Sequence, residues 1–145
     1  MIKKLPLATI AGAVAQFLLG WLVYGIILAK FMETNTNHFE GLMKDMNSGS
    51  FMVLIFCSGL VMSFMIAAIF QRWAKIKTFF NGFIGGLWLG FLLSLSYDLY
   101  FLAAMNLMSV GGTIVDIITS SITTGIVGGI IGWILGMGKK QVVVA

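Results

Sequence analysis

Charged and polar residues are scarce in this chain, and their scarcity excludes most kinds of soluble protein. Only 10% of the 145 residues are charged, and 59% are hydrophobic. Because soluble domains have about 25% charged residues, we expect an integral membrane protein whose main partner is the lipid bilayer. The single cysteine, Cys57, excludes an internal disulfide. The single histidine, His38, has only Glu40 close by in the sequence, which is too few ligands for a metal site.

Cofactor motifs are missing as well. The glycines between Gly82 and Gly90 lie inside an apolar stretch with no strand before them, so they do not form a Rossmann or P-loop phosphate site. No zinc-type spacing of cysteines and histidines occurs. We therefore expect no cofactor.

Long apolar runs make up most of the chain. A membrane-spanning helix needs about 20 predominantly apolar residues. Four stretches reach this length, at about residues 5–29, 50–71, 78–105 and 113–137. Short connections join them, and no charged or Pro/Ser/Gly-rich linker divides them. The sequence therefore predicts one all-α domain over residues 1–145, a polytopic membrane protein with a bundle of four transmembrane helices.

The only sizeable polar segment, residues 30–49, is expected to connect the first two spans. Within it, apolar residues recur at positions i, i+3, i+4 and i+7: Phe39, Leu42, Met43 and Met46. This spacing predicts a short amphipathic helix that lies on the membrane surface. Gln16, in the middle of the first span, is expected to hydrogen-bond to a neighbouring helix.

Basic residues are distributed unevenly around the predicted spans. Lys30 and Lys44 belong to the 30–49 segment. The other seven of the nine basic residues belong to the opposite side: Lys3, Lys4, Arg72, Lys75, Lys77, Lys139 and Lys140. The positive-inside rule then predicts an inner-membrane protein with both termini in the cytoplasm and the 30–49 segment outside. Because these residues stand at the ends of apolar segments, the net charge of +4 does not indicate nucleic-acid binding.

Small residues recur every four positions along the last two predicted spans. The third span carries Gly82, Gly86, Gly90, Ser94 and Asp98, and the fourth carries Asp116, Ser120, Thr124, Gly128, Gly132 and Gly136. In an antiparallel hairpin that turns near Leu107, equal distances from the turn pair each member of one ridge with a member of the other. In lipid, such a glycine zipper allows two helices to approach closely. The same glycines could instead contact another copy of the chain or a different membrane subunit.

Two of the five acidic residues, Asp98 and Asp116, fall within the predicted spans near the outer surface. An acid inside a membrane is a functional candidate by default. For Asp116 the structural alternative is helix capping, because Thr113 precedes it at the spacing of a capping box. For Asp98 the alternative is a hydrogen bond or ion pair with Lys30 or Tyr24.

The pairing of the ridges also suggests where a polar site would form. Ridges spaced by four residues cross and then diverge, so the acidic ends of the two helices would splay apart. This would open a small cleft toward the outside, lined by Ser94, Asp98, Asp116 and Ser120. Tyr97 and Lys30 are further candidates for the same cleft.

Three stretches of this sequence resemble those of a known protein family: residues 17–25 (FLLGWLVYG), residues 114–117 (IVDI) and residues 128–136 (GGIIGWILG). In these stretches the chain resembles a family of small four-span bacterial membrane proteins catalogued as a domain of unknown function. That family often has a proline after the Tyr-Gly pair, where this chain has Ile26. The resemblance implies a four-helix bundle and supplies no activity.

Three functions are compatible with these observations. The first is a non-enzymatic protein that acts through helix packing, as a homo-oligomer or as a subunit of a larger membrane complex. The second is a small transporter or channel in which Asp98 and Asp116 handle a proton or a cation. The third is an intramembrane aspartyl hydrolase, since the chain looks superficially like the four-helix lipoprotein signal peptidases, but it lacks their Asn-x-Ala-Asp motif.

Overall fold

The computed structural model describes residues 4–138, and this part of the chain is helical with short connections. The helices, in chain order, are α1 (Lys4–Leu22), the π-helical turn η1 (Val23–Ile27), α2 (Ala29–Asn35), α3 (Gly49–Ile69), the π-helical turn η2 (Phe70–Ala74), α4 (Phe79–Ala104) and α5 (Val110–Gly136). Lys3, Lys139, Lys140 and the tail at residues 141–145 lie outside the described residues.

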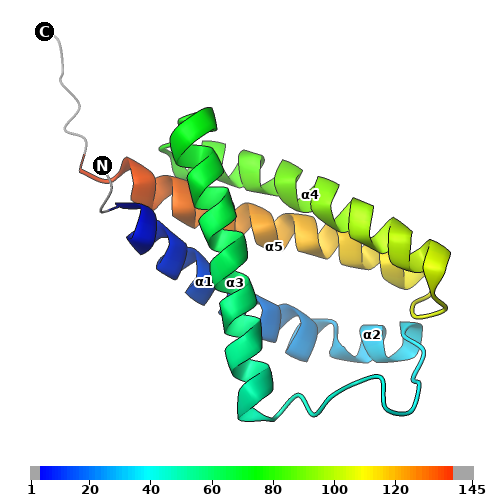
Figure 1. The fold of residues 1–145 in the computed structure, drawn as a ribbon. Helices are drawn as coiled ribbons and strands as arrows, with labels where there is room; N and C mark the ends of the chain where they lie inside the picture. Colours follow the sequence, from blue (N-terminus) through cyan, green and yellow to red (C-terminus); the bar gives the residue numbers. More distant parts are fainter. Residues whose placement is uncertain (1–3, 139–145) are drawn as a thin grey trace, which may run out of the picture.

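Four of the described helices are long and apolar enough to cross a membrane: Lys4–Ile27, Gly49–Ala74, Phe79–Ala104 and Val110–Gly136. This confirms the predicted fold class, an all-α bundle with four candidate transmembrane helices. The longest contact joins α4 and α5, which run antiparallel side by side. Helix α1 packs on α5, and α3 crosses the others at a steep angle and packs mainly on α1 (Figure 1).

Hydroxyl side chains define where three of the long helices begin. Ser48, Thr78 and Ser109 precede α3, α4 and α5, and each accepts a hydrogen bond from a backbone N–H in the first turn. An N-cap of this kind satisfies one of the donors that a helix leaves free at its start. These caps fix the two ends of the bundle. We call the end that holds Lys4 and Gly136 the terminal end, and the end that holds α2 and the α4–α5 turn the turn end.

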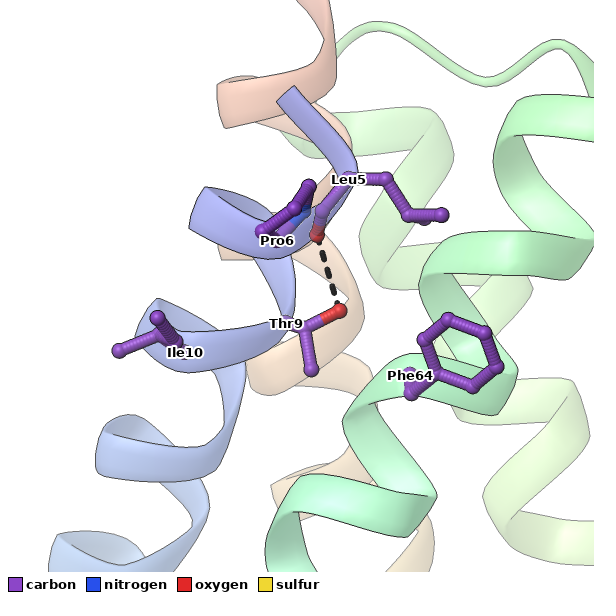
Figure 2. A pocket seen from close by; sticks show the side chains of 5 residues that line it. All are labelled: Leu5, Pro6, Thr9, Ile10 and Phe64. Atoms are coloured by element: carbon purple, nitrogen blue, oxygen red, sulfur yellow. Dashed lines mark hydrogen bonds between the residues drawn. The ribbon is translucent and has the colours of Figure 1, made fainter. Parts of the chain in front are cut away.

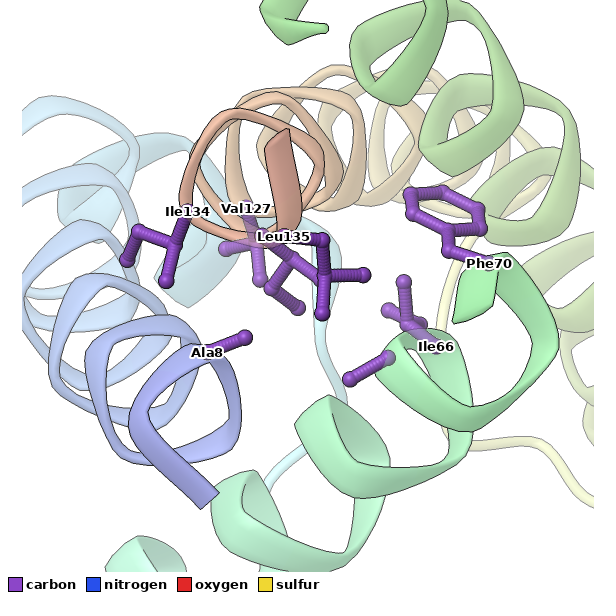
Figure 3. Close-up of a cluster of buried hydrophobic side chains, with 8 residues drawn as sticks. Ala8, Ile66, Phe70, Val127, Ile134 and Leu135 are labelled. Atoms are coloured by element: carbon purple, nitrogen blue, oxygen red, sulfur yellow. The ribbon is translucent and has the colours of Figure 1, made fainter. Parts of the chain in front are cut away.

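The buried core lies toward the terminal end, where α1, α3 and α5 meet (Figure 3). Ala8 of α1 and Ala67 of α3 contribute the smallest side chains, so that these helices can approach closely. Ile66 and Phe70 come from the α3–η2 segment, and Val127 with Leu135 comes from α5. Helix α4 has no residue among the fully buried members of this cluster and packs only the partly buried Leu89 against it. Its attachment to the bundle therefore depends mainly on its contact with α5.

That contact is made by the glycine ridges. A Cβ atom built on Gly128 would lie 2.5 Å from the carbonyl oxygen of Gly82 and 2.8 Å from the Cα of Gly86. One built on Gly90 would lie 2.6 Å from the Cβ of Thr124. The structure thus brings Gly86 against Gly128 and Gly90 against Thr124, as expected for a hairpin that turns near residue 107. Backbone touches backbone, which only glycine permits at this distance.

The remaining ridge glycines follow the same pairing. Gly132 lies against Gly82 and the end of the connection before α4, and Gly136 lies against the carbonyl group of Lys77. Other glycines of the hairpin, such as Gly125 and Gly129, are covered by Phe83 and Phe79 respectively. These glycines therefore serve contacts within the chain.

The amphipathic surface helix predicted from Phe39 to Met46 is wrong. The connection between α2 and α3 consists of turns in this stretch. Gly41 has a φ of +78°, a left-handed conformation that an α-helix does not allow. Asp45 accepts a hydrogen bond from the backbone N–H of Asn47, and this local bond competes with a helix. The short helix at this end is α2, which continues from α1 through the turn η1.

The first span departs from expectation at Gln16 and from regular helical geometry near its end. Gln16 is half-buried and forms no side-chain hydrogen bond among the described residues, so the predicted bond to a neighbouring helix is wrong. Near the turn end, the N–H of Leu28 donates to the carbonyl of Val23 at 2.7 Å, five residues back. This wider turn occurs without a proline, at the Tyr24-Gly25-Ile26 sequence.

Candidate functional site

Three separate elements bring polar side chains together inside the turn end of the bundle. Asp116 and Ser120 lie one helical turn apart on α5. The Tyr24 hydroxyl, which the turn η1 holds against them, donates to Oδ1 of Asp116 at 2.7 Å. It also lies 3.0 Å from Oγ of Ser120. Because Tyr24 uses its proton for Asp116, Ser120 is the donor in the second bond, and the three groups form a chain.

Asp98 of α4 completes this group. Its carboxyl group faces that of Asp116 closely enough for the two to interact directly. Oδ2 of Asp98 has no exposed surface and no hydrogen-bond partner among the described residues. Two ionised carboxylates in this position repel each other, whereas a proton or a cation between them relieves the repulsion. We call Tyr24, Asp98, Asp116 and Ser120 the carboxyl site.

A small cavity adjoins the carboxyl site on the side of the α4–α5 turn. Its volume is about 40 Å³, and a single water needs roughly 10–15 Å³ by the same measure. Asp98 is its only acidic wall. The other lining residues are Phe101, Leu102, Leu107, Met108 and Thr113. The cavity therefore has room for water or a small cation next to the unpartnered oxygen of Asp98.

The other predicted members of the cleft do not join the carboxyl site. The Ser94 hydroxyl donates to the carbonyl of Gly90 at 2.7 Å, within its own helix. Tyr97 is 62% exposed on the outer face of α4. Lys30 is exposed, and no ion pair joins it to either acid within residues 4–138. The cleft predicted from four residues is thus a smaller cavity, and of those four residues only Asp98 lines it.

The capping role predicted for Asp116 is also wrong. Helix α5 begins at Val110, and its cap is Ser109, whose hydroxyl accepts from the N–H of Gly112 at 3.0 Å. Thr113 is already inside the helix and donates back to the carbonyl of Ser109. Asp116 therefore lies beyond the first turn, where its partner is Tyr24 instead of the helix end.

A strap of polar residues closes the turn end above the cavity. The N–H of Asn37 donates to the carbonyl of Leu107 at 2.7 Å, and the N–H of Ser109 donates to the carbonyl of Asn35 at 2.8 Å. The Asn37 side chain donates to the carbonyl of Asn106 at 2.7 Å, and the Ser109 hydroxyl donates to Oδ1 of Asn35 at 2.7 Å. We call residues 35–37 the strap, because they join the end of α2 to the α4–α5 turn.

Only part of this arrangement has a signal in the sequence. Tyr24 was one of two alternative partners considered for Asp98, and the structure pairs it with Asp116. The strap was not predicted at all. Its only signal was the polar run from Thr34 to His38, which contains two asparagines capable of pairing with free backbone groups.

A second and larger hollow, of about 270 Å³, lies between α1 and α3 near the terminal end (Figure 2). It is lined by Leu5, Pro6, Thr9, Ile10 and Phe64. The Thr9 hydroxyl is its one polar side-chain group, and it donates to the carbonyl of Leu5 at 2.9 Å. This hollow is a shallow apolar pocket. Because the Thr9 hydroxyl is already hydrogen-bonded, no side-chain polar group of its lining is available to orient a ligand.

The fold and the carboxyl site define a multi-pass helical membrane protein with an acidic pair inside its helices. In comparisons with known proteins, no family model, no curated protein and no solved structure matches the chain. The resemblance to four-span proteins of unknown function therefore stays a prediction, and function must be argued from the carboxyl site itself.

Proposed function

We propose that this protein is a small proton- or cation-coupled transporter or channel subunit, and that its ion-binding groups are Asp98 and Asp116. The observation that carries the proposal is the meeting of two carboxyl groups inside the membrane-spanning helices, with no basic partner among the described residues. Acidic residues within membrane-spanning segments are rare and mark ion pathways and proton relays. The Ser120–Tyr24–Asp116 chain of hydrogen bonds supports this role, because it orients one carboxyl group toward the other.

The distribution of described basic residues supports an inner-membrane orientation with the carboxyl site near the outer surface. Lys4 donates to the carbonyl of Met137, and Lys77 lies against Gly136, so these cations share the terminal end with the basic turn around Arg72. The positive-inside rule assigns that end to the cytoplasm. The carboxyl site then faces the outside, where it would load its ion.

A single chain supplies only part of an ion path. Beyond the carboxyl site, the backbones of α4 and α5 touch at Gly86, Gly90 and Gly128, which leaves no gap between these helices. An ion released from Asp98 would therefore travel along another face of the bundle. We propose that a homo-oligomer or a second membrane subunit supplies the remaining wall of the path.

The test is ion flux in liposomes that contain the purified protein. Asp98→Asn and Asp116→Asn keep the shape of each side chain and remove its charge. We expect each variant to reduce proton or monovalent cation flux at least about tenfold relative to the unmodified protein, because the site then loses an ionisable oxygen. The readout is a pH-sensitive or cation-sensitive dye inside the liposomes.

Asp45→Asn is the matched control, because Asp45 undergoes the same chemical change in the exposed connection between α2 and α3. Its flux should equal that of the unmodified protein. Flux that matches protein-free liposomes, or that survives in both Asp98→Asn and Asp116→Asn, would contradict the proposal.

Assembly through helix packing is the second candidate function. Because the ridge glycines contact each other within the chain, a partner would have to bind elsewhere. One available face is the exposed stripe on α4, with large side chains every four residues: Phe80, Ile84, Trp88 and Leu92. Cross-linking through cysteines placed on this stripe would detect such a partner.

Intramembrane hydrolysis fits the geometry least well. An aspartyl hydrolase must hold a peptide strand between its two acids. The cavity beside Asp98 has about 40 Å³, which is room for water but not for a peptide. Tyr24 also occupies Oδ1 of Asp116. We therefore do not propose an enzymatic reaction.

A further inference from the structure

The strap and the cavity share the same residues of the α4–α5 turn. Leu107 and Met108 line the cavity next to Asp98. The same two residues belong to the turn that the strap holds, since Asn37 donates to Leu107 and Thr36 forms an antiparallel bridge with Met108. The backbone on the turn-end side of the cavity is therefore fixed by residues that belong to another part of the chain.

The attachment consists of hydrogen bonds with little apolar packing. None of the residues of α2 is buried. The side chains at positions 33, 34, 37 and 38 around the strap are exposed. Elements with few buried apolar contacts and solvent-exposed hydrogen bonds belong to the least stable parts of a fold. The strap can therefore open without disturbing the core, which lies at the other end of the bundle.

Helix α2, which ends in the strap, has irregular backbone on both sides. Helix α2 has only seven residues, from Ala29 to Asn35, and it follows the π-helical turn η1. Between them Leu28 departs from helical geometry, with φ of −100° and ψ of 2°. After the strap, the chain continues in turns to Ser48. A short helix between two irregular segments can swing as a unit with small changes of dihedral angle.

We propose that the strap is a lid over the Asp98 cavity, and that breaking its hydrogen bonds to residues 106–109 admits water and small cations from the turn end. The closed form is the one described above. In the open form, α2 moves away from the α4–α5 turn, and the turn is free to uncover Thr113 and Asp98. The role of the lid in ion loading rests on the proposed function, but the opening itself does not.

The test measures access to the cavity without any ion flux. Thr113 is 5% exposed and lines the cavity, so Thr113→Cys in a Cys57→Ser background places one thiol under the lid. The reagent is (2-(trimethylammonium)ethyl) methanethiosulfonate, whose permanent positive charge makes it membrane-impermeant, added to either face of the protein in liposomes. The rate of modification of this introduced thiol is followed by intact-protein mass spectrometry.

Two variants loosen the lid. Asn37→Ala removes the bond to the carbonyl of Asn106, and Asn35→Ala removes the acceptor of the Ser109 hydroxyl. We expect each to increase the modification rate of the introduced thiol roughly fivefold, the effect of one ordinary hydrogen bond on an opening equilibrium. The increase should occur only when the reagent is added on the turn-end side.

Thr34→Ala is the matched control, because the hydrogen bonds of the Thr34 hydroxyl stay within α2. The hydroxyl donates to the carbonyls of Lys30 and Phe31 and accepts from the side chain of Asn35. The modification rate of this variant should equal that of the parent. An unchanged rate in both asparagine variants would overturn the lid. So would a parent protein whose introduced thiol reacts as fast as it does after unfolding in sodium dodecyl sulfate.

The two proposals fail separately. If Asn37→Ala exposes the introduced thiol but Asp98→Asn leaves flux unchanged, the lid stands and the ion-binding function does not. If Asp98→Asn abolishes flux but the lid variants leave the thiol equally protected, the function stands and ions reach the carboxyl site by another route.

Discussion

The α4–α5 hairpin and the junction of α1 with α3 both use small residues, but they use them in different ways. In the hairpin, a Cβ atom on Gly128 would meet the backbone of Gly82 and Gly86. At the junction, which α5 also borders, a Cβ atom on Gly12 would meet side chains, Cδ1 of Ile131 from α5 at 2.7 Å and Oγ of Ser63 from α3 at 2.9 Å. Side chains can move aside and backbones cannot. The hairpin should therefore behave as one rigid body, and the junction should tolerate change.

The largest expected effect comes from enlarging a hairpin glycine. Gly128→Ala places a methyl group 2.5 Å from a carbonyl oxygen that belongs to the backbone of the facing helix. We expect a loss of about 3 kcal/mol or more in unfolding free energy, at or above the upper range of overpacking effects. The measurement is the unfolding midpoint in detergent micelles, followed by circular dichroism.

Gly20→Ala serves as the control for that substitution, because no atom lies within 4 Å of a Cβ built on Gly20. Helix propensity alone should make this variant neutral or slightly more stable. If Gly128→Ala unfolds at the same midpoint as Gly20→Ala, the rigid-hairpin interpretation is wrong.

A smaller effect is expected at the junction. Gly12→Ala requires that the buried Ile131 and Ser63 side chains shift, with no backbone atom of a facing helix in the way. We expect a loss of roughly 1–2 kcal/mol, within the range for overpacking that side chains can relieve. A loss as large as that of Gly128→Ala in the same unfolding assay would remove the contrast between the two regions.

The smallest effect has the opposite sign. Ser63 is fully buried, and its hydroxyl has no hydrogen-bond partner within residues 4–138. Ser63→Ala removes an unsatisfied polar group, so we expect stability to rise by about 1 kcal/mol. Ser121→Ala is the counterpart in α5, where the hydroxyl donates to the carbonyl of Ile117 at 2.6 Å. That variant should not gain stability, and equal gains for both would show that hydrogen bonding does not distinguish them.

The hairpin could be predicted from the sequence because its contact repeats. Glycine at positions 82, 86 and 90 and again at 128, 132 and 136 indicates one helix face over several turns, and an antiparallel turn then determines which residues pair. The junction has no such repeat. Gly12 and Ser63 meet where α3 crosses α1 steeply, and a single crossing leaves no periodic signal in either helix.

The carboxyl site could be predicted only in part for a related reason. Asp98 and Asp116 follow from the hairpin pairing, so their proximity was expected. Tyr24 and the strap reach the site from α1 and α2, and their positions depend on the π-helical turn between those helices. Residues Val23–Ile27 contain no proline, so the sequence gives no signal for this π-helical turn. The surface helix was predicted wrongly because apolar spacing outweighed Gly41, whose positive φ breaks the helix.

The turn η1 also determines the phase of everything that follows it up to the strap. A π-helical turn holds one residue more than an α-helical turn, and each residue of an α-helix rotates the chain by about 100° and advances it by about 1.5 Å. If residues 23–27 instead formed a regular α-helical turn, α2 would rotate by about that angle. Asn35 and Asn37 would then face away from residues 106–109. By absorbing one surplus residue, the π-helical turn thus keeps residues 35–37 in register with the cavity.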